Sequence, residues 1–360
     1  NMIGQDDHAT AAGIEVKDSD GTDYVDDIDI WDNTLTVGDD ATGILVENSD
    51  YATIGGWQNP FTDGDNGKNT ITGGKVGIKV VGNESAPVDN VKVLYNTVEN
   101  AKTGIEAQNT GNIWMFSNKV TGATDKGIYL RNSDGTDYVD DADIWDNTVD
   151  ELGNDAVGIK IQYSDFASLG PHLNDVFGED SMSMGNEITG GKVGIEITGS
   201  SHTMTRYNTV QGQIDGTRHD GIRITSGEQH KVRDNLVKNT GFDGIRIEDA
   251  DAVTARDNEI NDTFAAGISL YKATGTLVDD NNISNTGGSG IWANTAPGSE
   301  IKNNTIYDVG NDSGRPTNDG IHVKHTGEDR SNAGLTISGN TITNSGNNGI
   351  YASGPKNGTL

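Results

Sequence analysis

Residues 244–270 read GIRIEDADAVTARDNEINDTFAAGISL, and this stretch holds one full period of a repeat that runs through the chain. A Gly-Ile dipeptide opens the period at Gly244 and opens the next one at Gly267, and Asn258 lies between them. Residues 245–247 alternate aliphatic, charged and aliphatic, which is the period-2 pattern of a strand with one buried face. The stretch therefore predicts short strands and no helix.

The Gly-Ile dipeptide occurs thirteen times, at spacings from 23 to 36 residues. The dipeptides begin at Gly13, Gly43, Gly77, Gly104, Gly127, Gly158, Gly194, Gly221, Gly244, Gly267, Gly290, Gly320 and Gly349. A second motif, asparagine followed by any residue and an aliphatic residue, lies between consecutive dipeptides. It places asparagines at Asn33, Asn69, Asn96, Asn118, Asn147, Asn186, Asn208, Asn235, Asn258, Asn281, Asn304 and Asn340. Because an amide both donates and accepts, asparagines stacked at a strand spacing of about 4.8 Å can form an internal ladder.

A stack of short coils with these landmarks resembles the right-handed parallel β-helix of pectate lyases, alginate-modifying enzymes and phage tailspikes. The resemblance covers nearly the whole chain and implies an all-β solenoid of about 12–13 coils with an internal asparagine ladder. It implies the fold and not the activity, because one architecture of this kind carries many functions.

A larger repeat indicates an internal duplication. Residues 19–27 return as residues 133–141, and residues 71–78 return as residues 188–195. The predicted organisation is a single β-helix over residues 1–360, with duplicated four-coil units at about 13–126 and 127–243 and further coils at 244–360. Since a unique active site gains nothing from duplication, the repeat favours a structural or binding protein.

The composition limits the chemistry of the chain and the partners that it can bind. The chain has no cysteine, so disulfides and thiol catalysis are excluded. Its net charge is -30. A field of this sign repels nucleic acid and anionic membrane surfaces and attracts cations. No stretch reaches the roughly 18–20 apolar residues of a membrane span. Because the chain starts at Asn1 and opens almost directly on a coil, we expect it to be a segment of a longer protein.

Two acidic loops suggest calcium. Their candidate ligands are Asp18, Asp20 and Asp23, and the duplicated Asn132, Asp134 and Asp137. Alternating oxygen-bearing side chains with a glycine let a chain wrap a hard cation, although the full spacing of a helix-loop-helix calcium site is absent. The alternative is a solvated acidic turn.

The outward residues of the predicted Gly-Ile strands form the candidate ligand-binding face. In the C-terminal half they are Arg223, Arg246, Tyr271, Trp292, His322, Lys324 and Tyr351. Aromatic rings stack on sugar faces and arginine grips carboxylates, so this set suits a glycan. The alternative is a mixed surface in which the cations only neutralise nearby carboxylates.

We therefore expect an extracellular or cell-surface β-helix that binds a polysaccharide or cell-surface glycan, with calcium at the acidic loops and no catalysis. A polysaccharide lyase or uronate epimerase is the first alternative, in which Arg246 neutralises a carboxylate, His322 or Lys324 is the base and Tyr271 the acid. The Asp-Pro-His signature of alginate epimerases is absent. The second alternative is a filament or sheath subunit that associates through its coil ends.

Overall fold

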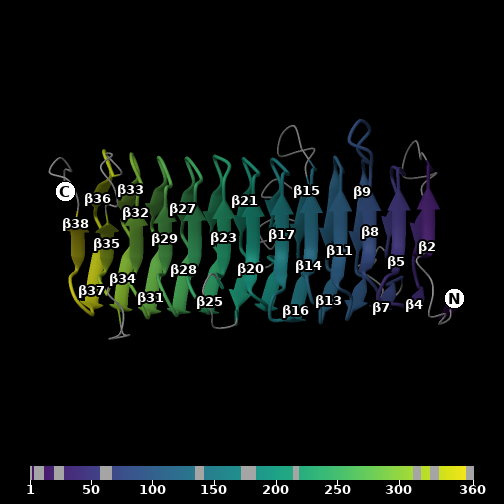
Figure 1. Cartoon of the computed structure of the whole chain (residues 1–360), viewed down its shortest axis with the longest axis horizontal. Coiled ribbons are helices and arrows are strands. Elements are labelled where there is room, and N and C mark those ends of the chain that lie inside the picture. Colours follow the sequence, from purple (N-terminus) through teal and green to yellow (C-terminus); the bar gives the residue numbers. More distant parts are fainter. Residues whose placement is uncertain are drawn as a thin grey trace. The chain divides into compact units, whose positions relative to one another are not determined.

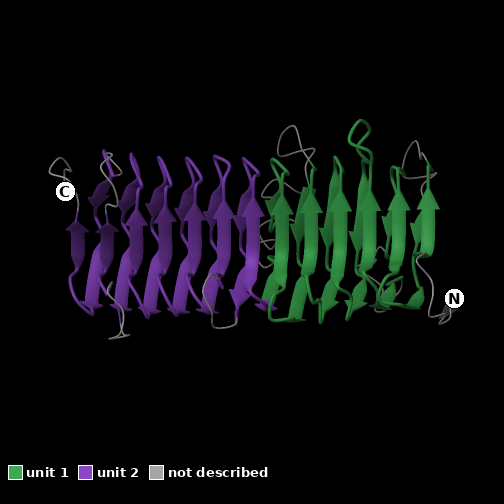
Figure 2. Ribbon diagram, in the orientation of Figure 1, with its two compact units in different colours: residues 1–188 green, residues 189–360 purple. Residues whose placement is uncertain are grey.

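The structure is a computed structural model of the chain (Figure 1). The described residues are 2–3, 12–19, 28–56, 67–133, 142–171, 184–213, 219–310, 318–324 and 332–353. They fall into two compact units, unit 1 (Asn1–Ile188) and unit 2 (Thr189–Leu360), which Figure 2 colours separately. No helix in the described ranges is long and apolar enough to cross a membrane.

Each unit contains three parallel sheets, which we name by their place in the repeat. Sheet B begins at the Gly-Ile dipeptide, sheet C follows it, and sheet A follows the ladder asparagine. In the described part of the chain, the two units together supply 13 strands to A, 13 to B and 12 to C. This agrees with the predicted number of coils and confirms the parallel β-helix.

The strands of unit 1 pair in chain order within each sheet. Sheet A contains β1 (Met2–Ile3), β4 (Thr34–Val37), β7 (Thr70–Gly73), β10 (Thr97–Glu99), β13 (Lys119–Thr121) and β16 (Thr148–Leu152). Sheet B contains β2 (Ala12–Lys17), β5 (Thr42–Glu47), β8 (Val76–Val81), β11 (Thr103–Gln108), β14 (Lys126–Arg131) and β17 (Val157–Gln162). Sheet C contains β3 (Asp29–Ile30), β6 (Thr53–Ile54), β9 (Val91–Leu94), β12 (Ile113–Phe116), β15 (Ala142–Trp145) and β18 (Ser168–Leu169).

Unit 2 has the same arrangement, and β19 (Glu187–Gly190) of sheet A contains the boundary. Sheet A continues with β22 (Thr209–Gln211), β25 (Leu236–Thr240), β28 (Glu259–Thr263), β31 (Asn282–Thr286), β34 (Thr305–Val309) and β37 (Thr341–Ser345). Sheet B contains β20 (Val193–Thr198), β23 (Ile222–Thr225), β26 (Ile245–Glu248), β29 (Ile268–Tyr271), β32 (Ile291–Asn294), β35 (Ile321–Lys324) and β38 (Ile350–Ser353). Sheet C contains β21 (Met204–Arg206), β24 (Lys231–Arg233), β27 (Thr254–Arg256), β30 (Leu277–Asp279), β33 (Glu300–Lys302) and β36 (Thr336–Ser338).

The Gly-Ile dipeptide has a packing reason. Its isoleucines stack in register down the interior, as Ile245, Ile268 and Ile291 do, and each of these three is 0% exposed. The preceding glycine faces the next coil at close range: a Cβ on Gly244 would lie 2.6 Å from the Gly267 carbonyl oxygen. Any side chain there would overlap the backbone, so the coils require glycine at this position.

The predicted asparagine ladder is present in both units. Asn235 Nδ2 donates to Asn258 Oδ1 at 3.0 Å and to the Thr205 carbonyl oxygen at 3.0 Å. The Asn235 backbone N–H donates to the same Asn258 Oδ1 at 3.1 Å. Equivalent bonds join Asn33 through Asn186 in unit 1 and Asn208 through Asn340 in unit 2.

A second ladder, of hydroxyl groups, follows sheet B in unit 1. The backbone N–H of Thr110 donates to Ser133 Oγ at 3.1 Å, and that of Ser133 donates to Ser164 Oγ at 3.0 Å. Ser133 and Ser164 are buried. The residue before Ser133, Asn132, has a φ of 48°, in the left-handed region that asparagine tolerates. In unit 2 this interior position holds Ser200 in the first coil and small apolar residues such as Ala250 and Ala273 in later coils.

Candidate functional site

All seven predicted ligand-binding residues lie on the outward face of sheet B in unit 2. The strand register pairs Arg223, Arg246, Ser269, Trp292, His322 and Tyr351 in one column, the first column. It pairs Thr225, Glu248, Tyr271, Asn294, Lys324 and Ser353 in the second column. The period-2 pattern therefore placed these side chains on one surface, and their binding of a ligand stays a prediction.

The two arginines of the first column are held by carboxylates of the protein itself. Arg223 Nη2 lies 2.6 Å from Asp220 Oδ2, and its Nη1 lies 3.3 Å from Glu196 Oε1. Arg246 Nη1 lies 3.2 Å from Asp243 Oδ2, and its Nε lies 3.1 Å from Glu248 Oε2. These arginine side chains are only 10% and 12% exposed. These contacts favour the alternative interpretation of the sequence, in which the arginines neutralise nearby carboxylates.

Three buried aspartates that the sequence reasoning missed organise this face. Asp220, Asp243 and Asp319 each precede a Gly-Ile dipeptide, and each contacts the outward residue three positions later. The sequence signal is Asp-Gly-Ile-Arg at two coils and Asp-Gly-Ile-His at a third. Because the outward residue follows the turn by three positions, its cationic or ring nitrogen reaches back to the carboxylate.

The aspartates are also tied to the neighbouring coils. Asp243 Oδ1 accepts from the Ala266 backbone N–H at 3.0 Å, and Asp243 Oδ2 accepts from Ser269 Oγ at 2.7 Å. Burial, followed by the nearby Asp220 carboxylate, raises the pKa of Asp243 to about 6. Burial also raises the pKa of Asp220, against the opposing charge of Arg223.

His322 is fixed by the third aspartate. Its Nδ1 lies 2.7 Å from Asp319 Oδ2, while Asp319 Oδ1 accepts from the backbone N–H of Asn348 at 3.0 Å and from its Nδ2 at 2.8 Å. A carboxylate acceptor at Nδ1 fixes the donor role there and leaves Nε2 as the acceptor in the neutral ring. The arrangement orients a base in the way that general-base catalysis requires.

Aromatic rings cover the C-terminal part of the face. The Tyr271 and Trp292 rings are parallel within 2°, with centroids 6.5 Å apart. The His322 and Tyr351 rings stack at 4.9 Å with an interplanar angle of 26°. Tyr351 is 41% exposed, and Lys324 is exposed on the same strand as His322. Two ring pairs and one cation therefore line this end of the sheet.

Arg246 and His322 are too far apart to act on one sugar. In the register they are separated by Ser269 and Trp292, hence by three strand spacings, or about 14 Å. A lyase or epimerase that uses Arg246 to neutralise a carboxylate and His322 to remove the neighbouring proton does not fit this distance.

The calcium prediction is only partly within the described residues, because Asp20, Asp23, Asp134 and Asp137 lie outside them. Asp18 and Asn132 both occupy left-handed turns after sheet B, with φ of 50° and 48°. Asp18 Oδ1 accepts from Asn48 Nδ2 at 3.2 Å. Over the described ranges, no group of three or more His, Cys, Asp or Glu side chains is placed to hold a metal ion. Calcium binding therefore stays a prediction.

Comparison with known proteins agrees with the fold. The family model described as "Right handed beta helix region" matches residues 12–180 and 193–359. No curated protein matches the chain. Among solved structures, the DFA-IIIase of Arthrobacter chlorophenolicus A6 in complex with GF2 is 14% identical, with a TM-score of 0.52 over 91% of this chain and 89% of that one.

Two further structures are less similar. The A-module of the Azotobacter vinelandii mannuronan C-5 epimerase AlgE6 is 14% identical, with a TM-score of 0.37 over 95% of this chain and 89% of that one. The Dettilon tailspike protein is 15% identical, with a TM-score of 0.46 over 88% of this chain and 57% of that one. At these identities the structural likeness concerns the fold alone, whereas the family model covers most of the sequence. The chain therefore belongs to the right-handed β-helix family.

Proposed function

We propose that the chain is an extracellular β-helix whose sheet B face in unit 2 binds a polysaccharide without transforming it. The observation that carries the proposal is the pair of ring stacks, Tyr271 with Trp292 and His322 with Tyr351, on consecutive coils of one sheet face. Sugars offer apolar C–H faces to such rings and hydroxyl groups to the polar residues between them.

The binding surface is the aromatic end of the face and not the arginine end. Because Arg223 and Arg246 are already paired with two carboxylates each, they have little charge to offer a ligand. Lys324 is exposed and supplies the cation of this end. The proposal rests on these residues of the chain, since the similar solved structures share the fold alone.

One observation favours a catalytic alternative. The contact between Asp319 and His322 orients the imidazole of the His322–Tyr351 stack, which is the geometry of a general base. The duplicated repeat and the 14 Å estimate for the Arg246 to His322 separation weigh against a lyase or an epimerase.

The test is retention in affinity electrophoresis on gels that contain alginate, pectate, dextran or hydroxyethyl cellulose. We expect Trp292→Ala and Tyr351→Ala each to weaken retention by about three- to tenfold, because each removes one stacking ring. Tyr307→Ala is the matched control: Tyr307 is 39% exposed, close to the 41% of Tyr351, but it lies on β34 of sheet A. Equal retention of all three variants on every gel would contradict the proposal.

A further inference from the structure

A second aromatic cluster lies on sheet C of unit 1, and none of its residues belongs to the site on sheet B. We call it the aromatic surface: Tyr95 follows β9, Trp114 and Phe116 lie on β12, and Trp145 ends β15. The register pairs Phe116 with Trp145. All four side chains are half-buried, so each ring keeps part of its area at the surface.

The rings hold one another in place. Phe116 and Trp145 stack with centroids 4.6 Å apart and an interplanar angle of 18°. Tyr95 meets Phe116 edge to face at 5.4 Å, and Trp114 meets Trp145 edge to face at 6.2 Å. A ring fixed by its neighbours loses little freedom when a ligand covers it, so the surface is preorganised for binding.

Hydrogen-bonding groups surround the rings. Lys92 Nζ lies 5.5 Å from the centroid of the Trp114 ring. Ser117 Oγ donates to Asp146 Oδ2 at 2.5 Å, and both residues directly follow ring-bearing residues of the surface. Apolar rings with hydroxyl, carboxylate and ammonium groups beside them match a sugar chain, whose apolar ring faces are bordered by hydroxyl groups.

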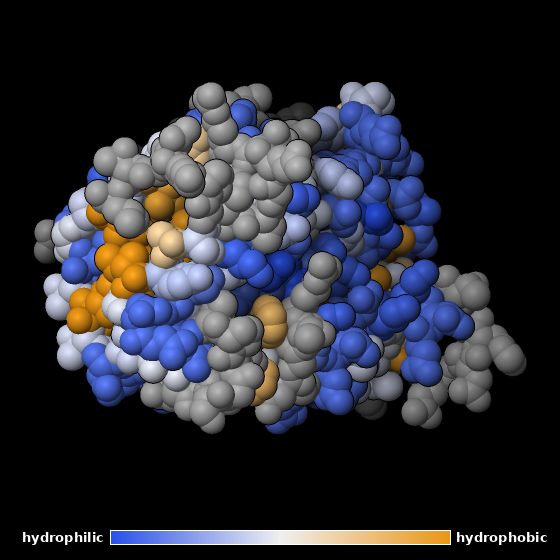
Figure 3. All heavy atoms as spheres, turned by 60° about the vertical axis from the view of Figure 1, so that its left-hand side comes forward, coloured by the Kyte–Doolittle hydropathy of each residue, from blue (hydrophilic) through white to orange (hydrophobic). Residues whose placement is uncertain are grey.

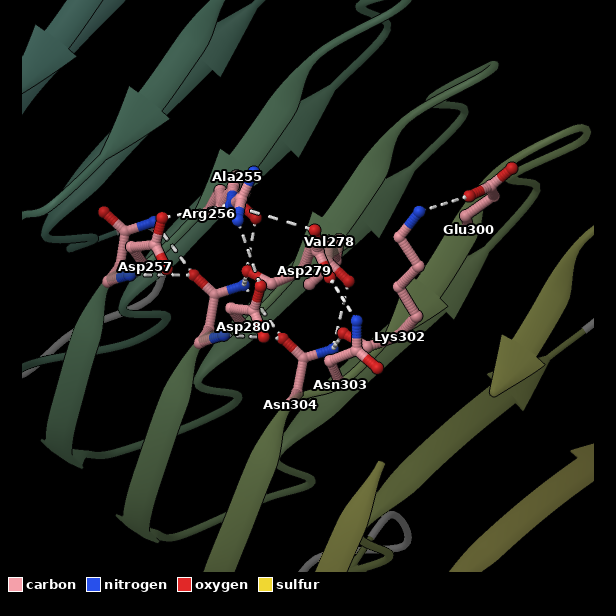
Figure 4. Close-up of polar contacts among 12 residues, drawn as sticks. Ala255, Arg256, Asp257, Val278, Asp279, Asp280, Glu300, Lys302, Asn303 and Asn304 are labelled. Atoms are coloured by element: carbon pink, nitrogen blue, oxygen red, sulfur yellow. Dashed lines mark hydrogen bonds and ion pairs between the residues drawn. The ribbon is translucent and has the colours of Figure 1, made fainter. Parts of the chain in front are cut away.

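The fold itself does not require aromatic residues here. Phe116 and Trp145 stand two positions before a ladder asparagine, and in unit 2 the same position holds Arg256, Asp279 and Lys302. Figure 4 shows that these residues form a polar network. Arg256 lies 3.0 Å from Asp257 and 3.2 Å from Asp280, and Asn303 Nδ2 donates to Asp279 at 3.0 Å. A coil therefore folds with charged residues at this position. The fold does not explain the aromatic residues of unit 1, so we look for their role in binding.

Charge restricts the ligand. Unit 1 contains 35 Asp or Glu and 10 Lys or Arg, a net charge of -25, whereas unit 2 contains 20 and 15, a net charge of -5. A polyanion would meet strong repulsion at unit 1, since the field of the whole unit acts on a long charged ligand. Among the residues that Figure 3 colours, hydrophilic ones cover the larger area and hydrophobic ones gather in smaller patches.

We propose that the aromatic surface of unit 1 binds an uncharged polysaccharide. The rings cover apolar sugar faces, and Lys92 and Asp146 hydrogen-bond to sugar hydroxyl groups. The site is separate from the one on sheet B and does not depend on it.

The experiment measures retention of the full chain in gels that contain hydroxyethyl cellulose, dextran or galactomannan as uncharged probes and alginate as the anionic one. We expect retention by at least one uncharged probe, and we expect Trp145→Ala and Trp114→Ala to weaken it by about three- to tenfold. Trp145→Phe should retain most of the binding. Because no ionic contact with the ligand is involved, raising the salt concentration should leave retention unchanged.

Two control variants test whether the retention belongs to the aromatic surface. Arg256→Ala alters the equivalent position in unit 2 and should bind the uncharged probe like the wild type. Tyr307→Ala removes an exposed ring on sheet A, outside both proposed sites, and should also leave this binding unchanged. No retention by any uncharged probe, or retention by alginate alone, overturns the inference. A dimer in sedimentation experiments that Trp145→Ala dissociates would also overturn it, because the surface would then be an interface between copies of the chain.

Discussion

His322 Nδ1 lies 2.7 Å from Asp319 Oδ2, and both side chains are almost fully buried, at 7% and 3% exposure. The same imidazole stacks on the Tyr351 ring at 4.9 Å. This one residue therefore serves the proposed binding face through its ring and the catalytic alternative through Nε2. Substitutions that separate the ring from the nitrogen decide between the two functions.

We expect His322→Ala to weaken polysaccharide retention about three- to tenfold and His322→Phe to keep it, because phenylalanine preserves the stack on Tyr351. Incubation of the wild type with alginate and pectate should give no unsaturated product by absorbance and no epimerisation by NMR. Product formed by the wild type and lost in His322→Phe would establish the catalytic alternative. Thermal unfolding of each variant checks that the fold is retained.

Asn235→Ala should lower the free energy of unfolding by about 1–3 kcal/mol, because it leaves buried ladder partners without hydrogen bonds. Asn235 is 1% exposed, and three acceptor oxygens lie within hydrogen-bond distance of the two N–H groups of its Nδ2. Asn340→Ala is the control, since Asn340 is the last asparagine of the series and is only half-buried. Urea denaturation measures both. A loss for Asn235→Ala no larger than that for Asn340→Ala would contradict the expectation that burial strengthens the ladder.

The glycines of the Gly-Ile dipeptides allow a matched pair. A Cβ on Gly290 would lie 2.8 Å from the Gly320 carbonyl oxygen and 2.4 Å from Ile306 Cγ2, whereas one on Gly349 would meet no described atom within 4 Å. We expect Gly290→Ala to destabilise the protein by about 1–3 kcal/mol through overpacking. Gly349→Ala should be neutral in the same denaturation experiment. A neutral Gly290→Ala would show that the coils can move apart.

The fold was predictable because its requirements repeat along the chain. Every coil needs a glycine where the backbones approach and an asparagine at the ladder turn. The structural positions of Gly244 and Asn258 can therefore be predicted from the recurrence of their motifs. The outward residues obey no such rule. Asp243 binds Arg246 because the turn directs the aspartate side chain toward the residue three positions later. Strand periodicity does not predict this direction.

The aromatic surface was missed for a related reason. Phe116 and Trp145 lie 29 residues apart in the sequence and stack only because their coils are adjacent. The stretch Asp29-Ile-Trp-Asp-Asn33, repeated as Asp143-Ile-Trp-Asp-Asn147, was the available signal. It became informative once the ladder asparagines fixed which neighbouring residues point outward.

The calcium prediction concerns the loops at residues 18–27 and 132–141. If Asp20 and Asp134 ligate the ion, the melting temperature should be higher with excess calcium than with chelator. By mass action, calcium at one hundred times its dissociation constant stabilises the folded state by about 2.7 kcal/mol. Asp20→Asn together with Asp134→Asn should remove the difference. Identical melting temperatures of the wild type with calcium and with chelator would contradict calcium binding at both loops.

The buried Asp243 gives stability a pH dependence of predictable sign. Its pKa is raised from 3.8 to about 6, first by burial, so the folded protein holds this proton more tightly than the unfolded chain does. The resulting contribution to stability is fully present below about pH 4 and is lost as the pH rises through 6. Relative to Asp243→Asn, which cannot titrate, the wild type should therefore lose up to about 3 kcal/mol between pH 4 and pH 7. Ser269→Ala removes a hydrogen bond that favours the charged carboxylate, so it should move this loss to higher pH. Urea denaturation at a series of pH values measures the free energy of unfolding of both proteins. If the wild type loses no stability relative to Asp243→Asn as the pH rises, Asp243 is not the buried acid inferred from its contacts.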